Sequence, residues 1–259
     1  MKEEKNHTYP TVSVIMPAYN AERFIEEAVR SVEAQSFQDW ELIIIDDRSK
    51  DGTADIAMQL AQEDGRIRFF QNEENLGVAR TRNRGFDLCR GSFVALLDSD
   101  DIWHPEKLER QLQLAGDTGA DIVYCSYGII GADGGQAKPA YLVPERTDFE
   151  RLLRENTIGC STVLLTAPIV EKYRFATDFY HEDYVLWLQL LREGHRAAGC
   201  TEVLVDWRYL ENSRSFNKQK SARNRWRIYR DYLKLPLGKS AWAFCGYVCA
   251  SLRKYGRRS

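Results

Sequence analysis

The fold of this chain is decided by one short stretch, which reads Phe93-Val94-Ala95-Leu96-Leu97-Asp98-Ser99-Asp100-Asp101. An apolar run ends abruptly in acidic residues, and Gly91 bounds the run on its amino-terminal side. A short apolar run with such boundaries predicts a buried β-strand. In open α/β sheets, ligands bind beyond the carboxyl ends of the strands, and the acids follow this strand at that end.

The acidic residues allow two interpretations. Asp98 and Asp100 are two positions apart, so a turn that starts at Asp98 can direct both carboxylates to one hard divalent cation bridging to a phosphate-bearing ligand. In the other interpretation the acids and Ser99 form only a turn, because Asp and Ser hydrogen-bond to their own backbone in turns. This stretch by itself leaves both interpretations open.

Strands and helices alternate along the first half of the chain. Apolar runs predict strands at 12–16, 42–45 and 67–71, before the strand that ends at Asp98. Helical periodicity predicts helices at 21–35, from about 53 to 63, at 78–88, and after Pro105. Pro17 is expected to stop the first strand. Continuous apolar strands with short connections predict a mostly parallel sheet flanked by helices, an α/β fold of the Rossmann-like type.

The pattern is looser after Thr118. The sequence predicts strands at 122–130, 162–165 and 203–207, a Gly- and Pro-rich loop at 131–144, and a buried helix at 184–191. Two helices rich in Arg, Trp and Tyr are predicted at 222–233 and 240–255. We therefore divide the chain into a frayed N-terminus (1–10), one domain (11–210) with halves 11–118 and 119–210, and a basic, aromatic-rich helical tail (211–259).

The composition argues against several classes of protein. The 259 residues carry a formal net charge of -2, which gives no overall attraction to nucleic acid. The six cysteines include no Cys-x-x-Cys pair and no Cys/His cluster at zinc spacing, so we expect buried, reduced thiols in a cytoplasmic protein without a signal peptide. Neither a Gly-x-Gly-x-x-Gly motif nor a Gly-Lys-Ser/Thr loop is present, which disfavours dinucleotide-binding proteins and P-loop kinases.

Polar residues follow three of the predicted strands, and they are Tyr19 with Asn20, Asp46 with Asp47, and Asp98 with Asp100. The carboxyl ends of parallel strands lie at one edge of a sheet, so these residues are expected to form one site. The alternative for the second pair is structural, because two acids before a helix can cap it or form an Asx turn.

Five motifs follow one another along the chain, and they read Val14-Ile15-Met16-Pro17-Ala18-Tyr19-Asn20, Ile45-Asp46-Asp47-Arg48-Ser49-Lys50-Asp51-Gly52-Thr53, Asn75-Leu76-Gly77 with Arg82-Asn83-Arg84-Gly85, Leu97-Asp98-Ser99-Asp100-Asp101, and Glu182-Asp183 before a Leu-Trp helix. In this order and spacing they resemble the family 2 glycosyltransferases, which are inverting, nucleotide-sugar-dependent enzymes of the A-type glycosyltransferase fold. The resemblance covers roughly residues 10 to 210. It implies that 11–118 is the nucleotide-binding half and 119–210 the acceptor half of a catalytic domain.

The resemblance also implies roles for single residues. Pro17, Tyr19 and Asp47 match positions that hold the uracil end of a UDP-sugar, with Asn20 beside them. Asn75 and Arg82 match positions that line the nucleotide and sugar-phosphate region. Arg48 departs from the family pattern, which more often has a small residue there.

For the acidic motifs the resemblance implies metal binding and base catalysis. Asp98 and Asp100 match the DXD motif that holds Mn²⁺ or Mg²⁺. Asp100 corresponds to the direct metal ligand, and Asp98 also lies on the nucleotide side, together with Ser99. Asp101 is expected to have a structural role in the turn. Asp183 matches the general base, and Glu182 is its rival. His181, just before them, departs from the commonest pattern.

The residue types suit glycosyl transfer on chemical grounds as well. A leaving diphosphate needs a hard cation to neutralise its growing charge, and two carboxylates on a turn can hold one. An acceptor hydroxyl must lose a proton, and a carboxylate distant in sequence from the acidic turn, such as Asp183, suits this role. The structural alternative for Asp183 is an acid placed at a helix start, where the helix dipole favours it.

The tail beyond Arg214 is basic and holds one acid, Asp231. Its last predicted helix combines apolar residues around Trp242 with basic residues, Arg253, Lys254, Arg257 and Arg258. This is the pattern of an interfacial helix, and it predicts peripheral membrane contact. The alternatives are a helical pair that packs on the domain, or nucleic-acid binding, and we expect no nucleic-acid partner.

The sequence therefore predicts a metal-dependent, inverting glycosyltransferase at the cytoplasmic face of a membrane. The donor is a nucleotide-sugar, most simply a UDP-sugar, and the acceptor is a saccharide hydroxyl, lipid-linked, in surface polysaccharide synthesis. The alternative is a catalytically silent nucleotide-sugar-binding or scaffold protein, against which the complete set of acids argues.

Overall fold

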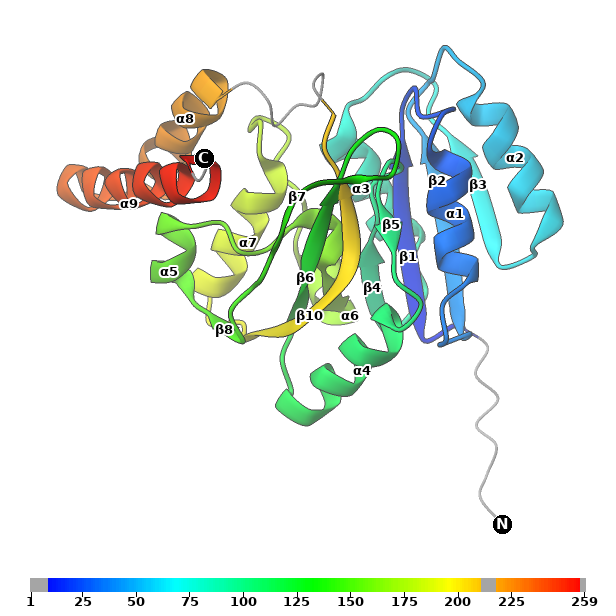
Figure 1. Ribbon diagram of the computed structural model, residues 1–259, viewed down its shortest axis with the longest axis horizontal. Helices are drawn as coiled ribbons and strands as arrows, with labels where there is room; N and C mark the ends of the chain where they lie inside the picture. The colour runs from blue at the N-terminus through cyan, green and yellow to red at the C-terminus, as the bar shows by residue number, and fades with distance from the viewer. Residues whose placement is uncertain (1–8, 211–217, 257–259) are drawn as a thin grey trace.

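The computed structural model describes residues 9–210 and 218–256, without the side chains of residues 218 and 253–256 (Figure 1). Its strands are β1 (Val12–Ala18), β2 (Trp40–Asp46), β3 (Ile67–Gln71), β4 (Phe93–Leu96), β5 (Ile102–Trp103), β6 (Ile122–Ile130), β7 (Gln136–Tyr141), β8 (Arg146–Thr147), β9 (Leu164–Thr166) and β10 (Ala197–Arg208). Its α-helices are α1 (Ile25–Glu33), α2 (Thr53–Glu63), α3 (Val78–Leu88), α4 (Lys107–Thr118), α5 (Phe149–Arg154), α6 (Ala167–Lys172), α7 (Glu182–Arg192), α8 (Lys218–Arg227) and α9 (Leu237–Gly256). The predicted frayed N-terminus falls almost wholly outside the described residues.

One sheet runs through both predicted halves, in the order β3-β2-β1-β4-β9-β6-β10-β5, with β7 on β6 and β8 on β10. The first four of these strands pair in parallel, as predicted for an α/β fold. In the second half the pairing is mixed, because β9 runs antiparallel to both β4 and β6 while β10 runs parallel to β6. The parallel half therefore brings the ends of β1, β2 and β4 to one edge.

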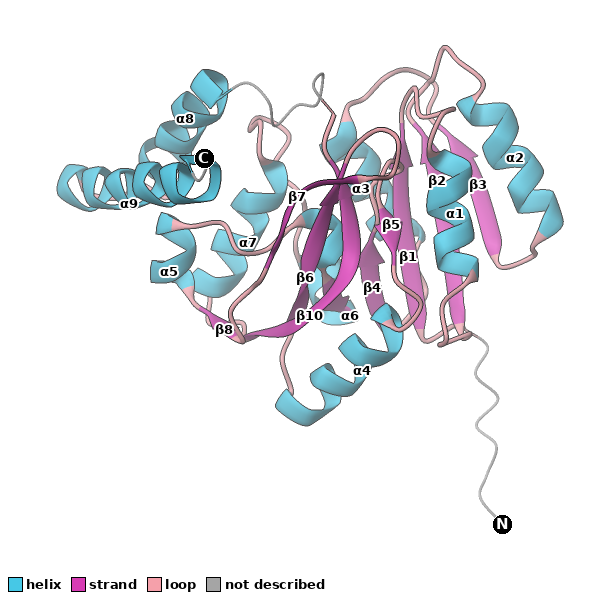
Figure 2. Cartoon of the chain, viewed as in Figure 1, coloured by secondary structure: helices cyan, strands magenta, loops and turns pink. Residues whose placement is uncertain are grey.

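Helices cover both faces of the sheet (Figure 2). One apolar layer lies under α1, α2 and α4, and the other lies under α3, α6 and α7. The predicted burial of α7 is observed, because Tyr184 to Leu188 and Leu190 are all buried. A helix with so little polar surface fixes its own first residues, which carry Glu182 and Asp183, rigidly against the sheet.

Pro17 does not stop the first strand, contrary to the sequence prediction. β1 continues to Ala18, and Pro17 pairs in register with Ile45 of β2. The carbonyl of Ile15 accepts from the amide of Leu97, so alternate residues 15 and 17 face β4, which ends at Leu96. The missing N–H of Pro17 therefore costs no ladder hydrogen bond.

The predicted loop 131–144 contains a strand, β7, that the sequence analysis missed. β7 pairs antiparallel with β6, and the rings of Tyr127 and Tyr141 stack 5.3 Å apart across the pair. β7 has a neighbour on one side only in the described sheet, so Pro139 is tolerated within it. Its largely exposed residues give no apolar alternation to predict from.

The C-terminal helices pack on the domain at α5 (Figure 1). A π-helical turn, Ile228–Tyr232, separates α8 from α9, and the buried Tyr229 donates its hydroxyl to the carbonyl of Leu153. No helix in the described part of the chain has the length and apolar character needed to cross a membrane. The expectation of buried thiols is wrong for Cys245 and Cys249, which are exposed on α9.

Gly85 sets how closely α3 approaches the sheet. A methyl group at this position would lie 2.4 Å from Cγ2 of Ile15 in β1, inside van der Waals contact. Only a residue without a Cβ lets α3 lie this near, and α3 carries Arg82 toward the carboxyl edge of the sheet.

We therefore expect Gly85→Ala to lower the free energy of unfolding by about 1–3 kcal/mol, because the helix must move off the strand. The matched control is Gly116→Ala in α4, where a methyl group meets nothing, and there a gain of up to about 1 kcal/mol is expected. Urea denaturation of both variants measures the difference. Equal stabilisation by both substitutions would refute the close approach.

Candidate active site

The acidic stretch forms a turn directly beyond β4. Leu97 still donates its amide to Ile15 of β1, and the amide of Asp101 then donates to the carbonyl of Asp98 at 3.1 Å. The turn interpretation is therefore correct as far as the backbone goes. It does not exclude metal binding, because the side chains of Asp98 and Asp100 are half-buried and only Asp101 is fully enclosed.

Asp101 is the structural member of the turn. Its Oδ2 accepts a 2.5 Å hydrogen bond from the hydroxyl of Ser161, and its Oδ1 accepts one from the amide of Arg208 at 2.9 Å. Burial, with repulsion from Asp100, raises the pKa of Asp101 well above its usual range. The side chain of Arg208 also donates to the carbonyl of Asp100, so β10 fixes the carboxyl end of the turn.

Arg82 joins the acidic turn to the start of α7. Its Nη2 lies 2.5 Å from Oδ1 of Asp98, and its Nη1 lies 2.6 Å from Oε1 of Glu182. The arginine is 4% exposed, and its Nε has no hydrogen-bond partner among the described residues. A buried cation between two carboxylates thus holds together segments that are far apart in the sequence.

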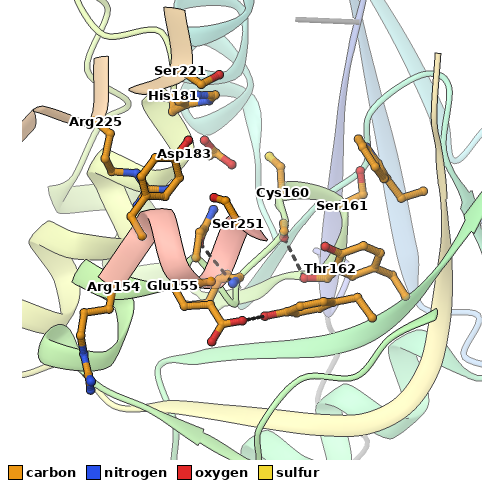
Figure 3. A pocket seen from close by; sticks show the side chains of 18 of the residues that line it. Arg154, Glu155, Cys160, Ser161, Thr162, His181, Asp183, Ser221, Arg225 and Ser251 are labelled. Carbon is orange, nitrogen blue, oxygen red and sulfur yellow. Dashed lines mark hydrogen bonds between the residues drawn. The ribbon is translucent and has the colours of Figure 1, made fainter. Parts of the chain in front are cut away.

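Asp183 and Glu182 differ in what they face. Glu182 is buried and its carboxylate is engaged by Arg82. Asp183 is half-buried and lines a cavity of about 650 Å³ that Asp98 also lines (Figure 3). Of the two candidates for the general base, Asp183 is therefore the one that a molecule in the cavity can meet.

The cavity lies between the acidic turn and the C-terminal helices. Its lining includes three aromatic side chains, Tyr127, Tyr141 and Trp207, and residues of α8 and α9 such as Arg225 and Tyr247. The sequence analysis separated this tail from the catalytic domain, whereas the structure makes the tail one wall of the cavity (Figure 3).

Besides Asp101, two carboxyl groups at this site have raised pKa values. Burial, and then repulsion from Asp98, raises the pKa of Asp100 to about 6. Burial, and then repulsion from Glu182, raises the pKa of Asp183 to about 6, although Arg82 opposes the shift. Carboxyl groups perturbed in this way inside one cleft are typical of catalytic or ligand-binding sites.

A second group of predicted residues lies at the ends of β1 and β2. The buried carboxylate of Asp47 accepts from Asn72 and from the amides of Leu76 and Gly77, and its carbonyl accepts from Asn75. Asp47 thereby shapes the loop before α3. A carboxylate has about four acceptor positions, so these three hydrogen bonds leave room for one donor from a ligand.

Tyr19 and Asn20 border this group on the solvent side. The Tyr19 ring is 46% exposed just beyond β1, and the side chain of Asn20 accepts from the amide of Lys50. Pro17 is buried beneath them. An exposed aromatic ring beside a shaped polar loop is a surface on which a planar base can stack.

Comparison with known proteins bears on this arrangement. The model of the family described as glycosyl transferase family 2 matches residues 13–168. A Bacillus subtilis glycosyltransferase named for teichuronic acid biosynthesis, TuaG, is 37% identical over 95% of this chain and 97% of its own length. The chain belongs to glycosyl transferase family 2.

A second relative and two solved structures extend the comparison. The Escherichia coli protein WfgD, named UDP-Glc:alpha-D-GlcNAc-diphosphoundecaprenol beta-1,3-glucosyltransferase, is 33% identical over 94% of each chain. The structure of Staphylococcus aureus TarS 1–349 with UDP-GlcNAc matches with a TM-score of 0.75 at 18% identity, over 94% of this chain and 73% of that one. The Pyrobaculum calidifontis mannosyltransferase PcManGT with GDP-Man and Mn²⁺ matches with a TM-score of 0.71 at 17% identity, over 98% and 77%. These structural matches confirm the A-type glycosyltransferase fold.

The departure of Arg48 from the family pattern has a structural counterpart. Its φ is 64°, in the left-handed region where a glycine is favoured, and its side chain is exposed. A glycine would adopt this φ without the steric cost that a Cβ brings. The second departure, His181, lies in the lining of the cavity next to Asp183 (Figure 3).

The sequence analysis missed three residues that complete the site: Ser161, Arg208 and Arg225. Ser161 and Arg208 hold the acidic turn, and Arg225 lines the cavity. The one available signal was Arg208, a charged residue at the carboxyl end of a predicted strand.

Within the described residues, no group of three or more His, Cys, Asp and Glu side chains is arranged to hold a metal ion. A hard divalent cation takes about six or more oxygen ligands, so one held by Asp98 and Asp100 would take the others from water or a bound ligand.

The ion pairs of Arg82 predict a large effect on stability. Arg82→Met leaves the buried Glu182 and the partly buried Asp98 without their cation, so we expect a loss of about 3–5 kcal/mol in the free energy of unfolding. Adding Glu182→Gln should recover part of this loss, because one uncompensated charge is removed.

Urea denaturation of the single and double variants measures these changes. The control is Arg80→Met, at an exposed position on the same helix, and its free energy of unfolding should change by less than about 0.5 kcal/mol. If Arg82→Met were as stable as this control, the stabilising role of the two ion pairs of Arg82 would be contradicted.

Proposed function

We propose that this family 2 glycosyltransferase transfers a sugar from a UDP-sugar to a hydroxyl of a lipid-linked saccharide, with inversion and with the help of a divalent metal ion. The observation that carries the proposal is that Asp183 and the acidic turn face the same cavity from different elements, α7 and the end of β4. Inverting transfer needs a base and a leaving-group site on opposite sides of the sugar.

The proposed reaction uses Asp183 as the general base. Its carboxylate takes the proton of the acceptor hydroxyl while that oxygen attacks the anomeric carbon, and the bond from this carbon to the diphosphate oxygen breaks. The electron pair leaves with UDP on the side of Asp98. Attack opposite to the departing group inverts the configuration, and no residue needs to form a covalent intermediate.

Asp98 and Asp100 suit a hard divalent cation, Mn²⁺ or Mg²⁺. Their carboxylates are close enough for mutual repulsion to raise the pKa of Asp100, and a cation between them would remove this repulsion. When bound, the cation would neutralise the charge that develops on the diphosphate. The Mn²⁺ in the PcManGT structure supports metal use in this fold.

The uracil end of the donor is proposed to lie over β1 and β2. Tyr19 offers its exposed ring for stacking, with Pro17 and Asn20 beside it, and Asp47 retains one acceptor position for a donor group of the base. Asn75 and Ser99 are proposed on the ribose and diphosphate side. The UDP-GlcNAc and UDP complexes of TarS, a protein of the same fold, support a UDP-linked donor.

The acceptor is proposed from the relatives. WfgD acts, by its name, on a diphosphoundecaprenol-linked sugar, and so does a Campylobacter jejuni relative that is 28% identical. A lipid-linked acceptor places the enzyme at the cytoplasmic face of a membrane. The catalytically silent alternative gains no support from the site, because Asp98 and Asp183 both line the cavity and Asp100 belongs to the same turn as Asp98.

Peripheral membrane contact is proposed through α9. Leu237, Trp242, Val248 and Leu252 of α9 are 63%, 47%, 39% and 65% exposed. Of the aromatic residues of α9, Phe244 packs against Trp226, and Tyr247 lines the cavity together with Val248 and Leu252. The basic residues Arg257 and Arg258 lie outside the described residues.

Co-sedimentation with anionic vesicles tests the membrane contact of α9. Trp242→Ser should weaken binding to the vesicles, whereas Met58→Ser, at an exposed apolar residue on α2, should not.

The base assignment predicts the effect of Asp183→Asn. We expect kcat for sugar transfer to fall by about 10²–10⁴, since the acceptor hydroxyl keeps its proton, with little change in the KM for the donor. Asp178→Asn, an exposed acid shortly before α7, serves as the control and should retain full activity. Transfer by Asp183→Asn at the wild-type rate would eliminate Asp183 as the base.

The pH dependence supplies a second readout of the same assignment. A general base acts in its deprotonated form, so the rate should be constant well above pH 6 and fall about tenfold per pH unit below the pKa of about 6. Measuring the affinities for UDP and Mn²⁺ over the same pH range separates the titration of Asp183 from that of Asp100. A rate that stays constant below pH 6 would count against the raised pKa.

A further inference from the structure

Arg225 is a buried cation in the wall of the cavity. It is 6% exposed, and its Nη1 has no hydrogen-bond partner in the described structure. Its guanidinium carbon lies 3.6 Å from the ring centre of Tyr184 and 4.7 Å from that of Tyr247. Among the described residues no carboxylate forms an ion pair with it.

A buried arginine without a counter-ion is costly. Removing a charged group from water is unfavourable, and stacking on aromatic rings offsets only part of this cost. The two rings nevertheless hold the guanidinium in place, because Tyr184 donates its hydroxyl to the carbonyls of Leu152 and Leu153. The arginine is thus positioned in advance of its missing partner, which is the arrangement of an anion-binding group.

Further hydrogen-bond donors line the same cavity. Ser221, one turn earlier on α8, also lines the cavity, and its buried hydroxyl has no hydrogen-bond partner in the described structure. Arg154 of α5 lines the cavity as well, with its guanidinium carbon 4.9 Å from the ring centre of Trp242. Figure 3 shows Ser221 and Arg225 near Asp183, and Arg154 with Glu155 in another part of the lining.

The charges of the two walls differ in sign. The acidic turn, which suits a metal and the donor diphosphate, forms one wall, and the wall of α8 and α9 carries Arg225. Asp183 lines the same space. A second anion bound at Arg225 therefore belongs to the acceptor, whose hydroxyl must reach Asp183, and not to the donor.

We propose that Arg225, with Ser221, binds a phosphate group of the acceptor, so that the acceptor is a saccharide joined to its lipid by phosphate or diphosphate. This inference rests on the proposed function, whose acceptor it specifies. The guanidinium presents parallel donors to phosphate oxygens, and Ser221 adds a hydroxyl donor. The apolar face of α9, which is proposed to touch the membrane, then lies beside the lipid end of the acceptor.

The test is a titration that requires no knowledge of the acceptor sugar. Protein saturated with UDP and Mn²⁺, so that the donor site is filled, is titrated with farnesyl diphosphate and with farnesol by calorimetry. The wild type is expected to bind the diphosphate and not the alcohol. We expect Arg225→Gln to raise the Kd for farnesyl diphosphate roughly tenfold or more, and Arg225→Lys to raise it less because the charge is kept.

The matched control is Arg223→Gln, an exposed arginine on the same helix that lies outside the cavity lining, and its Kd should equal that of the wild type. Thermal denaturation identifies any variant that fails to fold, and the comparison of diphosphate with alcohol on the wild type remains valid in that case. Equal affinity of the wild type for the diphosphate and the alcohol would overturn the proposal, as would a folded Arg225→Gln with unchanged affinity.

Methyl glucuronide is a third ligand, which supplies a carboxylate as the alternative anion. Binding of this sugar that depends on Arg225, without binding of farnesyl diphosphate, would refute the phosphate assignment. Failure of the proposed function is distinguishable, because it would appear as loss of UDP binding by the wild type or as absence of transfer with every donor.

Discussion

The buried guanidinium of Arg82 is the interaction on which the rest of the site depends. It binds Asp98 in the turn beyond β4 and Glu182 at the start of α7, and so it holds the proposed donor side and the proposed base side at a fixed separation. Gly85, one turn later in α3, lets the helix lie close enough to β1 for this reach. With Glu182 neutralised by Arg82, Asp183 is the carboxylate that remains available to the cavity.

The cavity joins elements that the sequence keeps apart. Strand β4 leads into the acidic turn, α7 supplies Asp183, the proposed base, and α8 supplies Arg225, whose Nη1 has no hydrogen-bond partner in the described structure. Two of these charged groups are held by neighbouring side chains and backbone, the turn by Ser161 and Arg208 and Arg225 by two tyrosine rings. Groups fixed in this way need little reorganisation when a charged substrate enters, which is the physical basis of electrostatic catalysis.

The sequence predicted the parts of this structure that depend on local pattern. The limits of β3, α3 and β6 agree with their apolar periodicity, and the acids at the ends of β2 and β4 lie at one edge, as parallel strands require. β7 was missed because an exposed edge strand with a proline shows no apolar alternation. Arg225 was missed because its burial and lack of a partner arise only when α8 packs on Tyr184, far away in the sequence.

The most direct test of the account is a calorimetric titration of UDP into the protein with Mn²⁺ and again with a chelator. We expect UDP to bind with Mn²⁺ and to lose about tenfold or more in affinity on chelation or in Asp100→Asn, with GDP binding weakly in every case. Equal UDP affinity with and without the metal ion, or a preference for GDP, would contradict the central claim that the acidic turn and the ends of β1 and β2 form one metal-dependent UDP-sugar site.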